Sequence, residues 1–204
     1  MMISPNDLEH PNSLEHLNSL YGQSEDPWHM RSGWQAERRR DLLLTALSHP
    51  RYGNTFEPGC ASGELTAGLA RRSDRVLAAD DNRPALSQAR ARTAHLSNVD
   101  IRWMQLPEQW PTEEKFDLIV LHQVGYRLDL ASWAALATAA RDSLGRDATV
   151  LACHYQHEFP ERILDTQTLH GVLDSILGLT RQTQVTDSEF TIDVWTNRAA
   201  PPRG

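Results

Sequence analysis

Phe56-Glu57-Pro58-Gly59-Cys60-Ala61-Ser62-Gly63 is the stretch of sequence that decides the fold. It follows a short strand predicted at Asn54 to Glu57 and leads into a helix predicted from Glu64 to Arg72. Its small residues at alternate positions let the backbone approach a ligand closely, and the next helix presents free N–H groups at its start. Because a doubly wound sheet places its ligand crevice at such a turn, the stretch predicts an α/β fold with a ligand site here.

Strands and helices alternate along the rest of the chain. Apolar residues at helical spacing predict an amphipathic helix from Arg38 to Leu47, ahead of the loop. The elements predicted after the loop are strands at Arg75 to Ala79, Val99 to Met104, Phe116 to Leu121 and Thr149 to Cys153, and helices at Pro84 to Thr93, Trp133 to Leu144 and Asp165 to Leu177. The runs Thr180 to Val185 and Phe190 to Trp195 predict a closing antiparallel hairpin.

This alternation predicts a Rossmann-like, doubly wound and mostly parallel seven-stranded sheet, with an antiparallel C-terminal hairpin and an N-terminal helical lid. The 204 residues suit one domain, which we expect at 26–198, between a flexible lead-in at 1–25 and a tail at 199–204. The two cysteines, Cys60 and Cys153, predict neither a disulfide framework nor a metal site.

The composition also excludes some classes of binding partner. The formal net charge of −7 gives no general attraction to nucleic-acid phosphates or to anionic lipid. The N-terminus lacks a secretory pattern, and no apolar run reaches membrane-spanning length. We therefore expect a cytoplasmic protein that binds neither nucleic acid nor membrane, and its oligomeric state is left open between monomer and homodimer.

The carboxylate of Glu57 distinguishes between cofactors. An acid at the end of the first strand would repel the pyrophosphate of a dinucleotide. S-adenosylmethionine has no phosphate and carries a cationic amino group and a sulfonium, so the acid suits it. Asp80 ends the second strand about twenty residues later, where a carboxylate accepts hydrogen bonds from ribose hydroxyls. The alternative is purely structural, with the glycines serving a tight turn and the two acids capping helices or facing solvent.

These residues resemble the class I S-adenosylmethionine-dependent methyltransferases, and more closely the NodS-like family, named for a rhizobial nodulation N-methyltransferase. The match runs from about Asp26 to Trp195. The blocks that carry it are Asp26-Pro27-Trp28 followed by Trp34, Arg51-Tyr52 leading into Phe56-Glu57-Pro58-Gly59-Cys60, Phe116-Asp117-Leu118-Ile119-Val120, and Phe190 to Trp195.

The resemblance implies S-adenosylmethionine as cofactor and a set of residues around it. Glu57 and Gly59 would lie by the methionine part, Asp80 by the ribose, and an N-terminal segment would close over the cofactor. The residues expected at the cofactor are Trp28, Trp34, Arg38, Glu57, Gly59, Cys60, Ala61, Gly63, Asp80, Asp81, Gln105, Leu106 and His122. For Trp28 and Trp34 the alternative is packing of the helix against the sheet, and for Arg38 to Arg40 it is a solvated face, which is favoured for Arg39 and Arg40.

The chain departs from the family pattern at two places. Family members often carry Ser-Glu-Val where this chain has His122-Gln123-Val124, so a carboxylate role there is lost. After the third strand, Trp103 to Pro107 lacks the acid that commonly contacts the adenine amino group. We therefore expect backbone and apolar contacts to adenine.

Methyl transfer is an in-line displacement, so the protein must align the acceptor and receive its proton where it carries one. His122, His154 and His157 follow the fourth and fifth strands and are the candidate catalytic residues, because an imidazole titrates near neutrality. For each of them an ordinary loop histidine is the alternative. The expected substrate-binding residues are Gln123, Tyr126 and Tyr155.

The acceptor is expected to be a small molecule, and the resemblance suggests an amine on a sugar or secondary metabolite. The chain lacks the Asn/Asp-Pro-Pro-Tyr run with which many enzymes hold the amines of bases and glutamine. Two other classes stay open: an inactive binding or scaffold protein of the same fold, and a dinucleotide-dependent oxidoreductase, which Glu57 disfavours.

Overall fold

The computed structural model describes residues 33–199. The predicted lead-in at 1–25, the Asp26-Pro27-Trp28 block and residues 200–204 lie outside the described residues, so the division into lead-in, domain and tail stays a prediction. Within 33–199, no helix has the length and apolar character that crossing a membrane requires.

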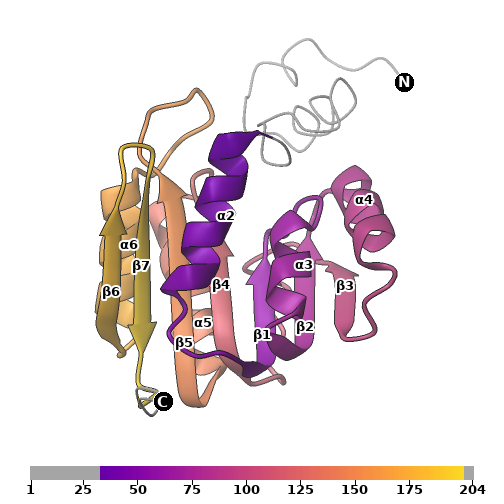
Figure 1. Ribbon diagram of the computed structural model, residues 1–204. Helices are drawn as coiled ribbons and strands as arrows, with labels where there is room; N and C mark the ends of the chain where they lie inside the picture. Colours follow the sequence, from indigo (N-terminus) through magenta and orange to yellow (C-terminus); the bar gives the residue numbers. More distant parts are fainter. Residues whose placement is uncertain (1–32, 200–204) are drawn as a thin grey trace.

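Seven strands form one sheet in the order β3-β2-β1-β4-β5-β7-β6 (Figure 1). Neighbouring strands from β3 to β5 are parallel, whereas β7 pairs antiparallel with both β5 and β6. The strands are β1 (Tyr52–Pro58), β2 (Ser73–Asp80), β3 (Val99–Trp103), β4 (Phe116–His122), β5 (Leu144–Tyr155), β6 (Thr180–Thr186) and β7 (Phe190–Thr196). The mostly parallel sheet with its antiparallel hairpin is confirmed.

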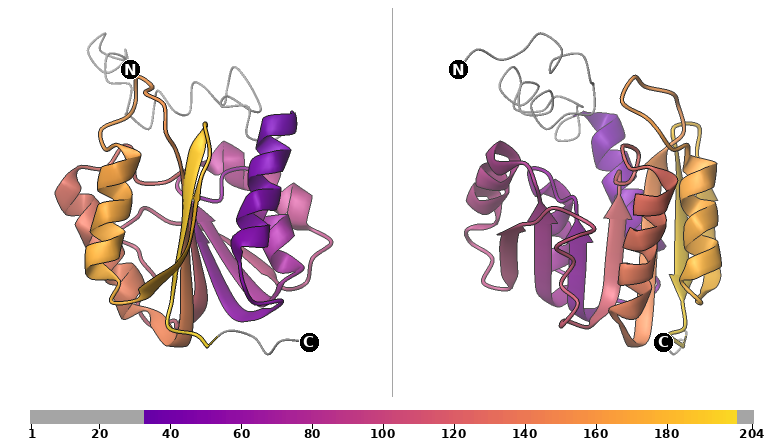
Figure 2. Two further views of the ribbon diagram at one scale, coloured as in Figure 1. Left: turned by 60° about the vertical axis from the view of Figure 1, so that its left-hand side comes forward. Right: turned by 180° about the vertical axis from the view of Figure 1, so that it is seen from behind.

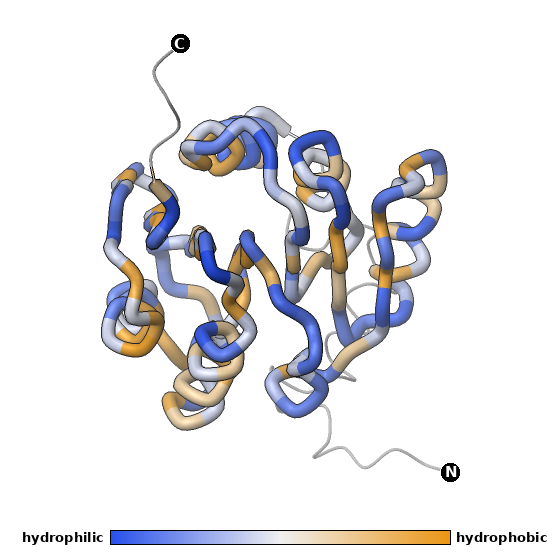
Figure 3. Tube along the Cα trace, turned by 90° about the horizontal axis from the view of Figure 1, so that it is seen from below, coloured by the Kyte–Doolittle hydropathy of each residue, from blue (hydrophilic) through white to orange (hydrophobic). Residues whose placement is uncertain are grey.

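Helices cover both faces of the sheet (Figure 2). One face carries α2 (Trp34–Ala46), α3 (Glu64–Ala70) and α4 (Arg83–Thr93), and the other carries α5 (Leu130–Asp142) and α6 (Thr166–Ile176). Seen from below, helices stand on both sides of the strands and each helix has hydrophilic and hydrophobic residues around it (Figure 3). The apolar sides of these helices bury the two halves of the core against the sheet.

Some element boundaries differ from the prediction for local reasons. The predicted helix Trp133 to Leu144 begins at Leu130, because Asp129 caps it by accepting a hydrogen bond from the Ser132 N–H at 2.7 Å. It ends at Asp142, and Leu144 already belongs to β5. The helix predicted at Arg38 begins at Trp34, one residue after Gly33, which has no side chain with which to cap it.

The strand order reverses between β1 and β4, because the chain runs outward through β2 and β3 and returns to the other side of β1. The loops after β1 and β4 therefore lead to opposite faces and leave a crevice between them. Gly59 and Val124 lie in these two loops and face each other, since a Cβ on Gly59 would lie 2.2 Å from Cγ1 of Val124.

Candidate active site at the carboxyl edge of the sheet

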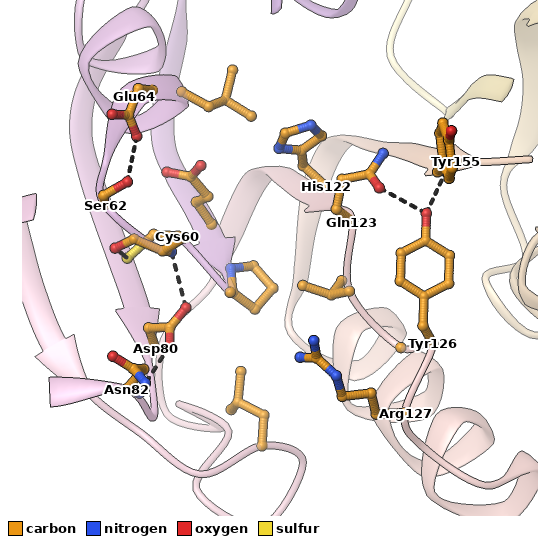
Figure 4. A pocket seen from close by; sticks show the side chains of 18 of the residues that line it. Cys60, Ser62, Glu64, Asp80, Asn82, His122, Gln123, Tyr126, Arg127 and Tyr155 are labelled. Carbon is orange, nitrogen blue, oxygen red and sulfur yellow. Dashed lines mark hydrogen bonds between the residues drawn. The ribbon is translucent and has the colours of Figure 1, made fainter. Parts of the chain in front are cut away.

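A cavity of about 740 Å³ lies at the carboxyl ends of the central strands. One wall carries Cys60, Ser62 and Asp80, and the opposite wall carries His122 and Tyr126 (Figure 4). The start of α2 and the segments around Phe159 and Glu189 also line it. A volume of this size lies within the range of cofactor and small-ligand sites.

The loop after β1 is shaped by its glycines and by hydrogen bonds to β2. The N–H groups of Gly59 and Cys60 both donate to the carbonyl of Ala79, at 2.7 and 2.9 Å. Gly59 and Gly63 have φ angles of +74° and +80°, which suit glycine. A Cβ on Gly63 would lie 3.0 Å from Ala89, so Gly63 allows α3 and α4 to pack and does not line the cavity.

Glu57 is a buried carboxyl on the cavity wall, with 2 % of its surface exposed. Burial raises its pKa to about 8; the Thr66 hydroxyl, which donates to Oε2 at 2.5 Å, opposes this, and the charges of Asp80 and Glu64 add to it. The free site therefore disfavours a negative Glu57, and a cation bound beside it would reverse that preference.

Asp80 lies beside Glu57 at the end of β2. The N–H groups of Ala61 and Asn82 donate to its two oxygens, each at 2.9 Å. The pKa of Asp80 is raised to about 6, because the effect of burial outweighs the lowering by these two N–H groups. A carboxylate has more acceptor positions than two bonds use, so Asp80 can still accept from a ligand. Asp81 also lines the cavity, and burial raises its pKa as well.

The segment after β3 contributes apolar residues. Met104 and Leu106 line the cavity, as the missing acid led us to expect for an adenine site. Gln105, predicted at the cofactor, is exposed and is absent from the cavity wall. Successive residues of an extended segment point to opposite sides, which places Leu106 inward and Gln105 outward.

His122 ends β4 and lines the cavity with 8 % of its surface exposed. Its Nε2 is buried and has no hydrogen-bond partner within the part of the chain that the structure describes. Burial, together with the charges of Arg39 and Arg40, lowers its pKa to about 3. At neutral pH the imidazole is therefore uncharged.

Gln123, Tyr126 and Tyr155 lie next to His122 and also line the cavity. The Tyr126 hydroxyl donates to Oε1 of Gln123 at 2.8 Å and accepts from the Tyr155 N–H. Gln123 adopts a φ of +58°, which is uncommon for a residue with a side chain. These bonds hold the expected substrate-binding residues together as one wall.

The other two candidate histidines do not face the cavity. His154 is completely buried and its ring nitrogens bond within the protein, Nε2 to the Val124 carbonyl at 2.7 Å and Nδ1 to Nε2 of His170 at 2.9 Å. His157 is exposed, 3.5 Å from a carboxylate oxygen of Glu189. His157 follows β5 as expected, whereas His154 lies within this strand, which extends to Tyr155. Strand direction alone does not decide toward which side a side chain points.

Helix α2 presents a different face from the one predicted. Trp34 and Arg38 lie on its outer side, where Arg38 pairs with Asp187 at 2.5 Å and covers the Trp34 ring. Arg39 and Arg40, predicted to be solvated, line the cavity instead. Had the helix been predicted to begin at Trp34, Arg39 and Arg40 could have been assigned to the cavity side. The cavity-lining residues are spaced by four along this helix: Gln35, Ala36, Arg39 and Arg40.

The family model described as Nodulation protein S (NodS) matches residues 14–144. Nodulation protein S of Sinorhizobium fredii is 32% identical over 121 residues, which cover 58% of this chain and 54% of that protein. That of Rhizobium tropici is 33% identical over 109 residues, covering 52% and 44%. The chain thus spans about half the length of these relatives.

Solved structures share the fold. A methyltransferase candidate from Pseudomonas syringae is 36% identical with a TM-score of 0.72, covering 81% of this chain and 100% of that one. The N-methyltransferase NodS from Bradyrhizobium japonicum WM9, solved with S-adenosyl-L-homocysteine, has a TM-score of 0.78 at 24% identity, covering 88% and 96%. The chain therefore belongs to the Nodulation protein S (NodS) family and has the Rossmann-like fold of S-adenosylmethionine-dependent methyltransferases.

Proposed function

We propose that the protein transfers the methyl group of S-adenosylmethionine to a small-molecule acceptor, most simply an amine. The observation that carries this proposal is the pair of carboxyls on the cavity wall, the buried Glu57 and the half-buried Asp80. A cofactor with an amino group and a sulfonium would stabilise the charged form of Glu57, which burial alone disfavours. A pyrophosphate would do the opposite.

The residues that line the cavity fit this cofactor. Gly59 lets the loop after β1 come into close contact with Val124, and His122, whose buried Nε2 has no partner among the described residues, lines the same cavity. We assign the amino-acid part to Glu57 and the loop from Gly59 to Ala61, the ribose to Asp80 and Asp81, and the adenine to Met104 and Leu106. In place of the outward-facing Trp34 and Arg38, we assign the methionine carboxylate to Arg39 and Arg40.

Methyl transfer would use His122 for the acceptor. S-adenosylmethionine supplies an electrophilic methyl carbon on a sulfonium, and an acceptor nitrogen must present a lone pair to it. With a pKa of about 3, His122 cannot keep a proton at neutral pH. We therefore assign it the hydrogen bond that orients the acceptor, while the proton leaves to solvent. His154 and His157 supply no group to the cavity and have no direct part in this step.

A binding protein without transferase activity is the second candidate. Gln123 stands where relatives often carry an acid, and its amide oxygen is already engaged by the Tyr126 hydroxyl. The neutral amide cannot assist an ammonium acceptor as a carboxylate would.

Calorimetry and a transfer assay test the two candidates. We expect S-adenosylhomocysteine to bind and NAD to give no heat of binding. Incubation with S-adenosylmethionine and a panel of amines, amino sugars and alcohols should give a product that is one methylene heavier by mass spectrometry. Failure to bind S-adenosylhomocysteine would overturn the proposal, and binding without transfer to any panel compound would favour the second candidate.

A further inference from the structure

A chain of buried hydrogen bonds runs from the antiparallel edge of the sheet to the cavity wall. Asp193 on β7 bonds through Oδ2 to Nδ1 of His170 on α6, at 2.7 Å. Nε2 of His170 bonds to Nδ1 of His154 on β5, at 2.9 Å. Nε2 of His154 bonds to the carbonyl of Val124, at 2.7 Å. All three side chains are buried, and none of them lines the cavity.

The chemistry of the two ends fixes where the protons are. A carbonyl only accepts, so Nε2 of His154 must donate to Val124. His154 is uncharged, since burial and the charge of His170 hold its pKa well below the usual range. Nδ1 of His154 therefore accepts, and Nε2 of His170 must donate to it. Because the carboxylate of Asp193 also accepts, His170 donates from both nitrogens and is an imidazolium.

The contacts of Asp193 Oδ2 identify it as an acceptor. Arg181 on β6 donates to it from a guanidinium nitrogen at 3.4 Å, and Nδ1 of His170 meets the same oxygen at 2.7 Å. Each of the three hydrogen bonds in the chain then has a donor and an acceptor.

The series of hydrogen bonds ends at a strained turn around Val124. Val124 lies between Gln123, with φ of +58°, and Gly125, with φ of +91°. The Val124 side chain contacts the cofactor loop at Gly59, and its neighbours His122 and Gln123 line the cavity. Turns of this kind persist only where the surrounding structure holds them.

We propose that Asp193 and His170 are positioning residues. Asp193 holds a doubly protonated His170, and His170 in turn fixes the tautomer of His154. His154 thereby keeps the Val124 carbonyl in place, together with the cavity wall on both sides of it. The kinetic part of this inference rests on the proposed methyltransferase function, whereas the proton arrangement does not.

Replacing Asp193 by Asn removes the group that fixes the protons. His170 loses its counter-charge and becomes neutral, and the Asn amide can either accept from Nδ1–H or donate to an unprotonated Nδ1, so the ring proton is no longer held on one nitrogen. Where the proton lies on Nδ1, Nε2 of His170 accepts and His154 must donate from Nδ1. The lone pair of His154 Nε2 would face the Val124 carbonyl oxygen, and two acceptors repel one another. The turn at Val124 is released without removal of any atom from the cavity.

Nitrogen-15 NMR of the histidine rings in the whole protein tests the proton arrangement, and its first measurement needs no variant. At pH 7 we expect two protonated nitrogens in His170 and an Nε2–H tautomer in His154. In Asp193→Asn we expect a neutral His170, a population of the Nδ1–H tautomer in His154 and a shifted Val124 carbonyl resonance. A neutral His170 in the unchanged protein, or unchanged tautomers in the variant, would overturn the proposal.

Enzyme kinetics test whether release of the Val124 turn slows methyl transfer. The substrate is an amine from the panel that the protein methylates. We expect Asp193→Asn to lower kcat on the order of 10- to 100-fold, as a misplaced reacting geometry does, while S-adenosylhomocysteine affinity changes less. His170→Gln should recover most of the kcat that His170→Phe loses, because its amide N–H can donate to His154.

Asp174→Asn is the matched control, because Asp174 joins the same helix and strand by accepting from Trp195 Nε1 at 2.8 Å without leading to Val124. An equal loss of kcat in Asp174→Asn would show that the hydrogen bonds from Asp193 to Val124 only stabilise the fold. If the unchanged protein methylates nothing, the proposed function fails, and the NMR outcome still decides the proton arrangement.

Discussion

At the scale of single residues, two carboxyls determine the character of the cavity. Glu57 is buried and Asp80 is half-buried, and desolvation raises the pKa of each, to about 8 and about 6. Native proteins seldom bury carboxyls that are not paired, because the charged form is costly to desolvate. Such a pair on a cavity wall is typical of a binding site whose ligand supplies the missing charge.

Glu57→Gln should make the free protein more stable at high pH. The folded pKa of about 8 lies above the ordinary 4.5, so the folded state binds more protons and the free energy of unfolding falls as pH rises between these values. With about 1.4 kcal/mol per pKa unit, urea unfolding at pH 8 should find the variant a few kcal/mol more stable. At pH 4.5 the difference should disappear. A difference that does not change with pH would contradict the assigned pKa.

The same carboxyl should release a proton when the cofactor binds. At pH 7 a cation beside Glu57 favours its ionised form, so the proton that burial retained is lost. Calorimetry in buffers of different ionisation heat should detect this release with S-adenosylhomocysteine, whose amino group is cationic. Glu57→Gln should bind more weakly and release no proton at this site. Equal release from both proteins would assign it to another group.

Asp80→Asn should weaken S-adenosylhomocysteine binding about 10- to 100-fold, which corresponds to hydrogen bonds with a charged partner. Asp74→Asn is the control, because Asp74 lies near the start of the same strand, where it pairs with Arg51 at 2.6 Å on the surface. Calorimetry should find its affinity unchanged. An Asp80→Asn variant that binds as tightly as the unchanged protein would exclude the ribose assignment.

At the scale of elements, the rotation of α2 decides which arginine serves the site. Arg39→Ala should weaken S-adenosylhomocysteine binding about 10-fold or more, as loss of a charge-assisted hydrogen bond does. Arg38→Ala, one residue away, should leave the affinity unchanged and lower stability only slightly, because its pair with Asp187 is partly exposed. Weaker binding in Arg38→Ala alone would restore the prediction made from the sequence.

The loops after β1 and β4 should not tolerate an added methyl group where Gly59 meets Val124. Gly59→Ala adds a Cβ 2.2 Å from Val124 at a φ of +74°. Gly178→Ala is the control, since Gly178 has a φ of +65° with nothing within 4 Å of an added Cβ. Denaturant unfolding should find a cost of about 1–2 kcal/mol for Gly178→Ala and about 1–3 kcal/mol more for Gly59→Ala. Equal costs would show that the loops are free to separate.

At the scale of the whole molecule, the cofactor should stabilise the fold, because it binds only when the loops after β1 and β4 are assembled. S-adenosylhomocysteine at 100 times its dissociation constant should add about 2.7 kcal/mol. For a chain of this length that raises Tm by about 5–11 °C. NAD at the same concentration should leave Tm unchanged in the same thermal scan. A rise with NAD as large as that with S-adenosylhomocysteine would restore the oxidoreductase alternative.

The sequence by itself determined the order of the elements and the candidate cofactor loop. Hydrophobic periodicity is a local property, so the run from Phe116 to Leu121 could be assigned to a buried strand without its neighbours. Parallel strands bring their carboxyl ends to one edge, and therefore Glu57, Asp80 and His122 could be predicted to meet there.

Only the tertiary structure decided which side chains face the cavity. Arg38 and Arg39 are adjacent on one helix, and the packing of α2 turned Arg38 toward Asp187 and Arg39 toward the cavity. His154 was predicted beside the cofactor, but its partners, the Val124 carbonyl and His170, are 30 and 16 residues away in sequence and hold it inside the core. The direction of a side chain depends on these distant contacts, whereas periodicity records only the identity of neighbouring residues.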